Sequence, residues 1–207
     1  GKIDWAEHAN DGVTTMEEVI QFQEAIQSAV DFYDEHPDDT LIVVTADHST
    51  GGFTIGNSST GYETYFDLLT NQKGSQVAFQ EKVKSALETN SNLSFEEFAS
   101  QITAFFGLVL DPNAPAETGI EAAVEAYKEQ QESNRLICSQ EEYQELKTAV
   151  EESMKASEEQ NVQYGGYDPV SITATHIFDK KAGLAWTTMA HAGEKVPVYA
   201  MGSGAYM

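Results

Sequence analysis

The apolar, β-branched stretch Thr40–Thr45, with the sequence TLIVVT, constrains the fold more than any other part of the chain. Its apolar residues do not alternate with polar ones, which is typical of a strand buried on both faces of a parallel sheet that helices cover. Asp47 and His48 follow directly after this predicted strand. Because ligands of open α/β sheets bind at the carboxyl ends of strands, these two residues are candidates for chemistry.

An amphipathic helix is predicted before this strand, over residues 14–33. Its apolar residues recur at helical spacing, and Thr15 and Glu18 have the relation of a capping box. Pro37, in the polar stretch 36–39, predicts the turn between the helix and the strand. Further helical patterns are predicted at Val77–Leu87, Phe95–Phe106, Thr118–Gln131 and Glu141–Met154.

Strand patterns return near the end of the chain, at Ser171–Phe178, Gly183–Thr188 and Val196–Ala200. Sequences typical of an α/β core therefore flank a long, mostly helical stretch. We predict an incomplete three-layer α/β/α fold with a mainly parallel sheet. Residues 1–58 would form one part of the core, residues 59–168 a mostly helical insertion, and residues 169–207 the returning part of the core.

The formal net charge of −23 limits the partners of the chain. Such a charge repels the phosphate backbone of nucleic acids and favours cations, so we expect no nucleic-acid partner. Cys138 is the single cysteine, which excludes a disulfide within the chain. No apolar run approaches the roughly 20 residues that span a membrane. The chain begins at Gly1 without an initiating methionine, which we interpret as the cut end of a longer protein.

Three short motifs contain side chains that could bind a metal ion. Asp4 and His8 are four residues apart, so they share one face of a helical turn and can reach the same ion. Asp47 and His48 can serve one site if the backbone leaves strand geometry, which the glycines at positions 51 and 52 allow. His191 falls in a glycine-containing loop between two predicted strands. Taken singly, each motif also has a structural interpretation: a surface Asp and His at a helix start, an aspartate that caps the next element beside an incidental histidine, and a hydrogen-bonded loop histidine.

Together, the five side chains form a set of carboxylate oxygens and imidazole nitrogens that suits zinc. Five protein ligands exceed the four of one tetrahedral structural site, which suggests two metal ions. Two metals about 4 Å apart are a recurring device for the cleavage of phosphate esters.

Three blocks of the sequence resemble the bacterial alkaline phosphatases. They are GKIDWAEHAND at residues 1–11, TLIVVTADHSTGG at residues 40–52 and HAGEKVPVYAMG at residues 191–202. The blocks follow one another in the family's order, and the resemblance covers residues 1–56 and about 172–207. The helical stretch between them is not diagnostic of the family.

The resemblance implies zinc-dependent hydrolysis of small phosphomonoesters through a phosphoserine intermediate. Asp4, His8 and His191 then correspond to ligands of a first Zn²⁺, and Asp47 and His48 to ligands of a second Zn²⁺. The family also uses Mg²⁺, whose ligands are expected outside this chain. The resemblance further implies a periplasmic or secreted bacterial protein, for which a homodimer is one expected assembly.

The serine nucleophile of the family lies in the amino-terminal half of its members and has no counterpart in this chain. Ser203 lies between two glycines but lacks the Gly-x-Ser-x-Gly arrangement, so we interpret it as a loop residue. Arg135, the single arginine, falls in the helical stretch and is a poor counterpart of the family's phosphate-binding arginine. We therefore expect the chain to be inactive alone.

Two other functions are compatible with the sequence. The chain could be a non-catalytic metal-binding or interaction module whose acidic helical stretch binds a partner, or part of a related hydrolase that acts on phosphodiesters or sulfate esters. Among the other noticeable side chains, we interpret His36 as a surface residue, His176 as a packing residue and Trp186 as a support beneath the loop of His191.

Overall fold

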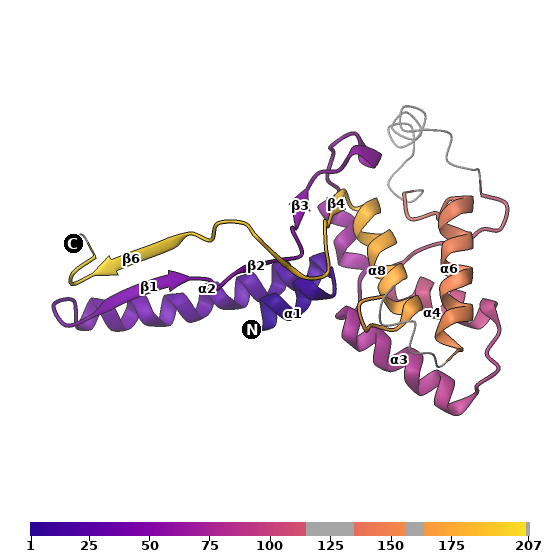
Figure 1. Ribbon diagram of the computed structural model, residues 1–207, viewed down its shortest axis with the longest axis horizontal. Coiled ribbons are helices and arrows are strands. Elements are labelled where there is room, and N and C mark those ends of the chain that lie inside the picture. Colours follow the sequence, from indigo (N-terminus) through magenta and orange to yellow (C-terminus); the bar gives the residue numbers. More distant parts are fainter. Residues whose placement is uncertain (115–134, 156–163, 206–207) are drawn as a thin grey trace.

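The computed structural model describes residues 1–114, 135–155 and 164–205. These residues form a helical body and an elongated arm that projects from it (Figure 1). The body contains α3 (Gln76–Thr89), α4 (Phe95–Phe106), α6 (Gln140–Ser153) and α8 (Pro169–Lys181). The arm contains α2 (Gly12–Glu35), β1 (Leu41–Thr45) and β6 (Val198–Gly202).

Short elements connect the arm to the body. They are α1 (Lys2–His8), β2 (Ser49–Thr50), β3 (Thr54–Ile55), β4 (Leu184–Ala185), β5 (His191–Ala192) and the 3-10 helices η1 (Ser58–Thr60) and η2 (Phe66–Asn71). β1 pairs with β6, β2 with β5 and β3 with β4, each as a two-stranded antiparallel sheet. The strands near the carboxyl terminus therefore pair with the strands near the amino terminus in reverse order.

The strand pairing differs from the predicted mainly parallel sheet, because every named strand pair in the described residues is antiparallel. β1 is also not buried on both faces. Leu41 and Val43 are 50% and 52% exposed, whereas Ile42 and Val44, which alternate with them, are partly buried. Within the described residues, α2 packs against β1 and β6 pairs with one edge, so one face of the strand has no cover.

The predicted helix over residues 14–33 is confirmed as α2, but its start differs from the prediction. The carboxylate of Asp11 accepts a hydrogen bond from the backbone N–H of Thr14 (3.0 Å) and caps the helix. Thr15 lies inside the helix and is buried. The predicted capping box of Thr15 and Glu18 is therefore wrong.

The strand predicted at Ser171–Phe178 is wrong, because these residues belong to helix α8. The carboxylate of Asp168 accepts a hydrogen bond from the backbone N–H of Ser171 (2.9 Å), and Pro169 occupies the first turn, where a missing N–H is harmless. α8 packs against α3, α4 and α6 and is buried on almost every side. A helix buried in this way has no polar face, so its sequence resembles a buried strand.

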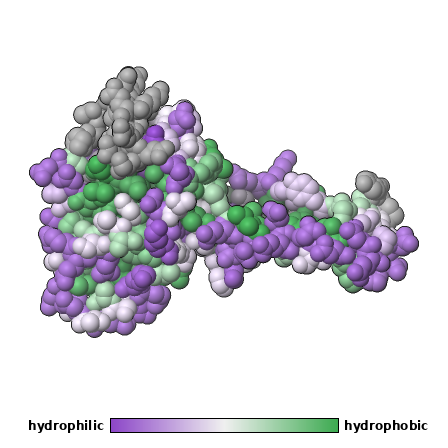
Figure 2. Space-filling model, turned by 180° about the vertical axis from the view of Figure 1, so that it is seen from behind, coloured by the Kyte–Doolittle hydropathy of each residue, from purple (hydrophilic) through white to green (hydrophobic). Residues whose placement is uncertain are grey.

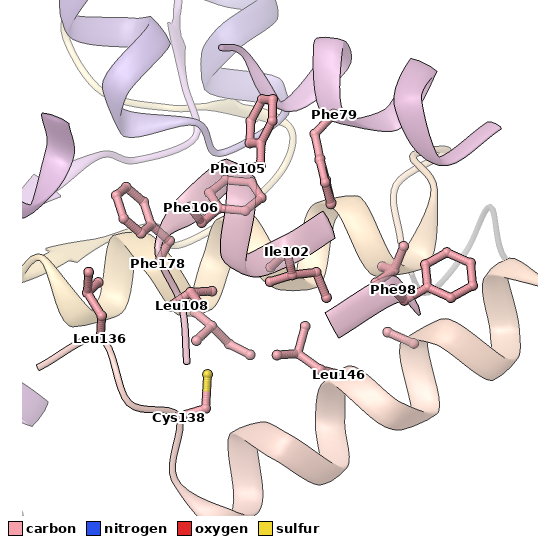
Figure 3. Packing of buried hydrophobic residues seen from close by; sticks show 14 of the residues in the cluster. Phe79, Phe98, Ile102, Phe105, Phe106, Leu108, Leu136, Cys138, Leu146 and Phe178 are labelled. Carbon is pink, nitrogen blue, oxygen red and sulfur yellow. The ribbon is translucent and has the colours of Figure 1, made fainter. Parts of the chain in front are cut away.

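The apolar core lies between the helices of the body (Figure 3). Phe79 contacts Phe105 and Phe106 with ring centroids 4.8 Å and 5.1 Å apart. Aromatic pairs of this kind contribute about 0.5–1.5 kcal/mol beyond the burial of their area. Cys138 is buried in the same cluster, where its free thiol packs as a small apolar side chain. The body thus provides a rigid support for the segments that carry the polar motifs.

The helices predicted at Val77–Leu87, Phe95–Phe106 and Glu141–Met154 are confirmed as α3, α4 and α6. The helix predicted at Thr118–Gln131 lies outside the described residues. The division at residues 58 and 168 stays a prediction, although α8 packs against helices of the predicted insertion. No helix in the described ranges is both long and apolar enough to cross a membrane.

The arm exposes many large apolar side chains, which we call the apolar strip. Its members are Val19, Ile20, Phe22, Phe32, Leu41, Val43, Val198, Tyr199 and Met201. Figure 2 shows hydrophobic surface along the arm between hydrophilic side chains. Each of these side chains is at least 40% exposed, and exposed apolar side chains gathered on one arm mark a candidate interaction surface.

Candidate metal centre

The three polar motifs meet where the arm joins the body. Asp4 and His8 lie on α1, His48 directly precedes β2, and His191 begins β5. The antiparallel pairing of β2 with β5 places Thr50 opposite His191, and α1 packs against β2. Segments far apart in the sequence therefore bring their side chains to one place.

Three side chains form a cluster that could hold one cation. Single ligand atoms of Asp4, His48 and His191 all lie within 4.8 Å of one another. The imidazoles of His48 and His191 stack with centroids 3.6 Å apart, and His191 Nε2 lies 3.8 Å from Asp4 Oδ1. One carboxylate and two imidazoles are a donor set that zinc binds, with a fourth position left for another ligand. The donor chemistry therefore fits the metal that the sequence predicts.

His8 borders this cluster from the same helix as Asp4. Its Nδ1 donates a hydrogen bond to the backbone carbonyl of Met189 (2.7 Å), because a carbonyl oxygen can only accept. In the neutral ring, Nε2 then keeps its lone pair, and it lies 3.4 Å from Asp4 Oδ1. A backbone carbonyl that fixes the tautomer in this way is the usual partner of a metal-binding histidine.

Asp47 is the most peripheral of the five predicted ligands. Its side chain is 90% exposed, and Oδ2 lies 3.5 Å from His48 Nε2. The backbone turns sharply beyond it, with positive φ angles of 75° at Gly51 and 58° at Gly52. The departure from strand geometry lies at Asp47 itself, where the backbone bends between β1 and β2, and the glycine turn follows only after β2.

Thr50 is a member of the site that the sequence reasoning missed. Its hydroxyl donates a hydrogen bond to Asp4 Oδ1 (2.7 Å) and lies 3.2 Å from His48 Nδ1. Since the single hydroxyl proton goes to Asp4, the oxygen is left to accept from Nδ1–H of His48. His48 Nε2 is then the atom with a free lone pair. The one signal available was the position of Thr50, two residues after His48.

The field at the cluster favours a positive charge. Burial raises the pKa of Glu7 above its ordinary value, and the neighbouring Asp4 carboxylate raises it further, whereas His48 and His8 lower it. A cation placed close to two neighbouring carboxylates stabilises their negative charges. The acidic surroundings and the donor set therefore both favour the binding of a cation at this cluster.

Asn10 ties α1 to the segment before β5. With its amide oriented to suit its neighbours, the side chain donates to the carbonyls of Thr188 (2.9 Å) and Glu7 (2.8 Å) and accepts from His176 Nε2 (3.3 Å). Burial lowers the pKa of His176 to about 4, so its ring is neutral near pH 7. His176 thus supports the site from α8 and does not join the cluster.

Ser203 and Arg135 lie away from the cluster. Ser203 donates its backbone N–H to the carbonyl of Thr40 (2.9 Å), at the end of β1 opposite to His48. A five-residue strand spans about 16 Å, which separates this serine from the histidines. The guanidinium of Arg135 lies 3.8 Å above the ring of Tyr65, where it makes a cation–π contact. Both placements agree with the predictions for these residues.

Comparison with known proteins places the chain in a family. The family model described as alkaline phosphatase matches residues 1–207. The chain is 32% identical to alkaline phosphatase 3 of Bacillus subtilis, over 97% of this chain and 33% of that protein. It is 29% identical to alkaline phosphatase 4 of the same organism, over 98% of this chain and 33% of that protein. The chain thus spans about a third of the length of these relatives.

Solved structures support the same assignment. The cold-active alkaline phosphatase of a psychrophilic Shewanella species matches 98% of this chain and 38% of its own, with 25% identity and a TM-score of 0.62. The Thermus thermophilus alkaline phosphatase shares the fold, with 20% identity and a TM-score of 0.63 over 99% of this chain and 37% of its own. The chain belongs to the alkaline phosphatase family.

Proposed function

We propose that the chain forms the metal-binding part of a zinc-dependent phosphatase that hydrolyses small phosphate monoesters. The observation that carries the proposal is the convergence of Asp4, His48 and His191, with ligand atoms within 4.8 Å of one another. These residues come from three separate segments, which the β2–β5 pairing and the packing of α1 against β2 bring together. Membership of the alkaline phosphatase family supplies the reaction class.

In this proposal, Asp4, His8 and His191 hold a first zinc ion, and Asp47 and His48 hold a second. Bound zinc supplies a Lewis acid that lowers the pKa of water and stabilises charge on phosphoryl oxygens. The protein's own part is to fix the donors. Met189 and Thr50 hold the rings of His8 and His48 with Nε2 free for a ligand. The hydroxyl of Thr50 also orients the Asp4 carboxylate.

The nucleophile belongs to the proposal for the intact protein. The alkaline phosphatases of B. subtilis are about three times as long as the matched region, and a serine there would form the phosphoserine. A magnesium site and its ligands would also lie in that remainder. This chain alone would then bind zinc without turning over substrate. A periplasmic or secreted location belongs to the same proposal.

The exposed apolar strip of the arm is consistent with the proposal that a longer protein contains further structure beside this chain. Leu41, Val43 and Val198 present exposed apolar side chains on a two-stranded ribbon with a free edge. In a protein of the relatives' length, further strands would pair with the free edge and helices would cover such a face. A homodimer formed through the strip is the alternative. Sedimentation of the isolated chain distinguishes them, since the homodimer requires a species of twice the chain mass.

The test of the proposed metal site is the amount of zinc bound by the purified chain and by two variants, His48→Ala and His191→Ala. The zinc dissociation constant can be measured by competition with a chromophoric chelator. We expect each substitution to weaken binding at least ten-fold, because each removes one of a few ligands. His36→Ala is the matched control, because His36 contacts Phe32 on the arm (centroids 4.6 Å apart). Unchanged zinc binding in both variants would rule out the ligand assignment.

The reaction class needs a separate assay on the protein of full length. We expect hydrolysis of p-nitrophenyl phosphate and little hydrolysis of its diester or of the sulfate ester. Preference for the diester or the sulfate would keep the metal site and change the substrate class.

A further inference from the structure

Asp179, on α8, carries a buried carboxyl group that the proposed chemistry does not use. Its residue is 1% exposed, and Oδ1 has no hydrogen-bond partner. Burial, and to a lesser extent the charge of Asp11, raise the pKa of Asp179 to about 8, while hydrogen bonds from Trp186 and Gly12 lower it only in part. A buried carboxyl group of this kind is destabilising unless it holds something in place.

A single oxygen of Asp179 joins two segments of the chain. Oδ2 accepts a hydrogen bond from the backbone N–H of Gly12 (2.9 Å) and another from the indole Nε1–H of Trp186 (2.8 Å). Gly12 begins α2, four residues after His8. Trp186 lies between β4 and β5, five residues before His191. The same atom therefore contacts one residue shortly after α1 and one shortly before β5, and both of these elements carry proposed ligands.

Trp186 also contacts the turn at Gly51, which follows His48 and β2. A Cβ at Gly51 would lie 2.7 Å from two indole carbons, so the glycine backbone rests directly on the ring. The Trp186 ring also packs against Phe53, with centroids 4.5 Å apart. Gly51 is held on its other side, because its carbonyl accepts from the N–H groups of Thr187 and Thr188. Movement of the indole would thus move the turn that follows His48.

Gly12 links Asp179 to α2, the helix against which α1 packs with its proposed ligands Asp4 and His8. A Cβ at Gly12 would lie 2.8 Å from Asp179 Oδ2 and 2.5 Å from Leu184 Cδ1, so the start of α2 fits closely against α8 and β4. α1 packs against α2 and carries Asp4 and His8. The position of α1 relative to β2 therefore depends on the same carboxyl group.

We infer that Asp179 and Trp186 position the metal centre, by setting the distance between α1, which carries Asp4 and His8, and the β2–β5 pair, which carries His48 and His191. This inference rests on the proposed zinc site. Asp179 and Trp186 are positioning residues and touch neither substrate nor metal. Side chains that orient metal ligands in this way change metal affinity by about 10–100-fold when they are replaced.

The test uses Trp186→Phe, which keeps an aromatic ring on Gly51 and removes the indole N–H. Asp179→Leu removes the acceptor, and Asp179→Asn retains an oxygen that can accept from both donors. Thr175→Val is the matched control, because Thr175 is also buried in α8 and its hydroxyl bonds the carbonyl of Ser171 (2.9 Å). Two quantities are measured for each variant: the zinc dissociation constant, and the hydrogen exchange of the Gly51 amide without metal.

We expect Trp186→Phe and Asp179→Leu to weaken zinc binding at least ten-fold and to speed exchange of the Gly51 amide, which bonds the carbonyl of Ala190 (3.0 Å). Asp179→Asn should stay within about three-fold of the parent in affinity. If Asp179→Leu does not fold, Trp186→Phe decides the matter alone. The inference is overturned if Trp186→Phe leaves both quantities unchanged, or if Thr175→Val alters them equally.

The two proposals fail in distinguishable ways. A parent chain that binds no zinc refutes the proposed metal site, and the exchange of the Gly51 amide then still shows whether Asp179 and Trp186 hold the turn. A parent chain that binds zinc, with unaltered affinity in Trp186→Phe and unaltered exchange, refutes the positioning role alone.

Discussion

Replacement of Thr50 by valine probes the link between the two proposed groups of ligands. Valine has nearly the shape of threonine but lacks the hydroxyl, which donates to Asp4 Oδ1 at 2.7 Å and lies 3.2 Å from His48 Nδ1. Thr50 is only 3% exposed, so water cannot easily replace the lost partner. Thr50→Val therefore leaves one carboxylate oxygen and one ring N–H without this bond.

The expected size of the effect follows from the strength of that interaction. A hydrogen bond to a charged group contributes about 1.5–3 kcal/mol. If the bond orients Asp4 in the zinc-bound protein, its loss weakens zinc binding roughly 10–100-fold, since about 1.4 kcal/mol corresponds to a factor of ten. The freed His48 ring can also adopt the other tautomer, which removes the lone pair from Nε2.

The measurement is chelator competition at constant pH on the parent, Thr50→Val and Thr50→Ser. Serine keeps the hydroxyl and should recover most of the affinity. Thr54→Val is the control for loss of a threonine hydroxyl, because Thr54 is exposed on β3 and bonds only the carbonyl of Ala185 (3.3 Å). Equal zinc affinity in the parent and Thr50→Val, or equal weakening by serine and valine, would refute the reasoning.

Three further predictions concern the body. The Asp179 pKa of about 8 means that the folded chain retains a proton that the unfolded chain releases near pH 4, so the free energy of unfolding falls as pH rises towards 8. Urea unfolding of the metal-free wild type and of Asp179→Asn measures this loss. Relative to the variant, the wild type should lose about 1.4 kcal/mol per pH unit between pH 5 and 7. Burial raises the pKa of Cys138 to about 12, so alkylation by iodoacetamide at pH 8 should require unfolding. Lys181 Nζ lies 2.7 Å from Glu142 Oε2 in a buried pair. Lys181→Met should lower the free energy of unfolding by about 3–5 kcal/mol, and a loss below 1 kcal/mol would show that the pair is unimportant.

The motifs of the proposed metal centre could be singled out in the sequence because their spacing has a direct geometric meaning. The i, i+4 relation of Asp4 and His8 places both on one face of α1, where His8 Nε2 lies 3.4 Å from Asp4 Oδ1. The glycines after His48 announce a turn, and the positive φ of Gly51 confirms it. Thr50 and Asp179 could not be recognised, because a threonine or an aspartate acquires its role from a partner far away in the sequence.

The failed predictions have the same physical origin. The β-branched run of α8 predicted a strand, although the cap formed by Asp168 and Pro169 was visible before it. The burial of α8 on nearly every side removed the polar face that normally identifies a helix. For β1, the run of apolar residues predicted burial on both faces, whereas Leu41 and Val43 are exposed on the arm. The apolar run of β1 indicates a strand that requires cover on both faces, and the described residues cover only one of them.

The central claim is that Asp4, His48 and His191 belong to one metal centre, in which Asp4 and His191 bind a first zinc ion and His48 binds a second. A crystal of the chain grown with zinc, measured at the zinc absorption edge, tests it most directly. The account predicts one anomalous peak about 2.0–2.2 Å from a carboxylate oxygen of Asp4 and an imidazole nitrogen of His191, and a second peak at a similar distance from an imidazole nitrogen of His48. A peak bound only by acidic side chains of the body, with none at this cluster, would contradict the claim.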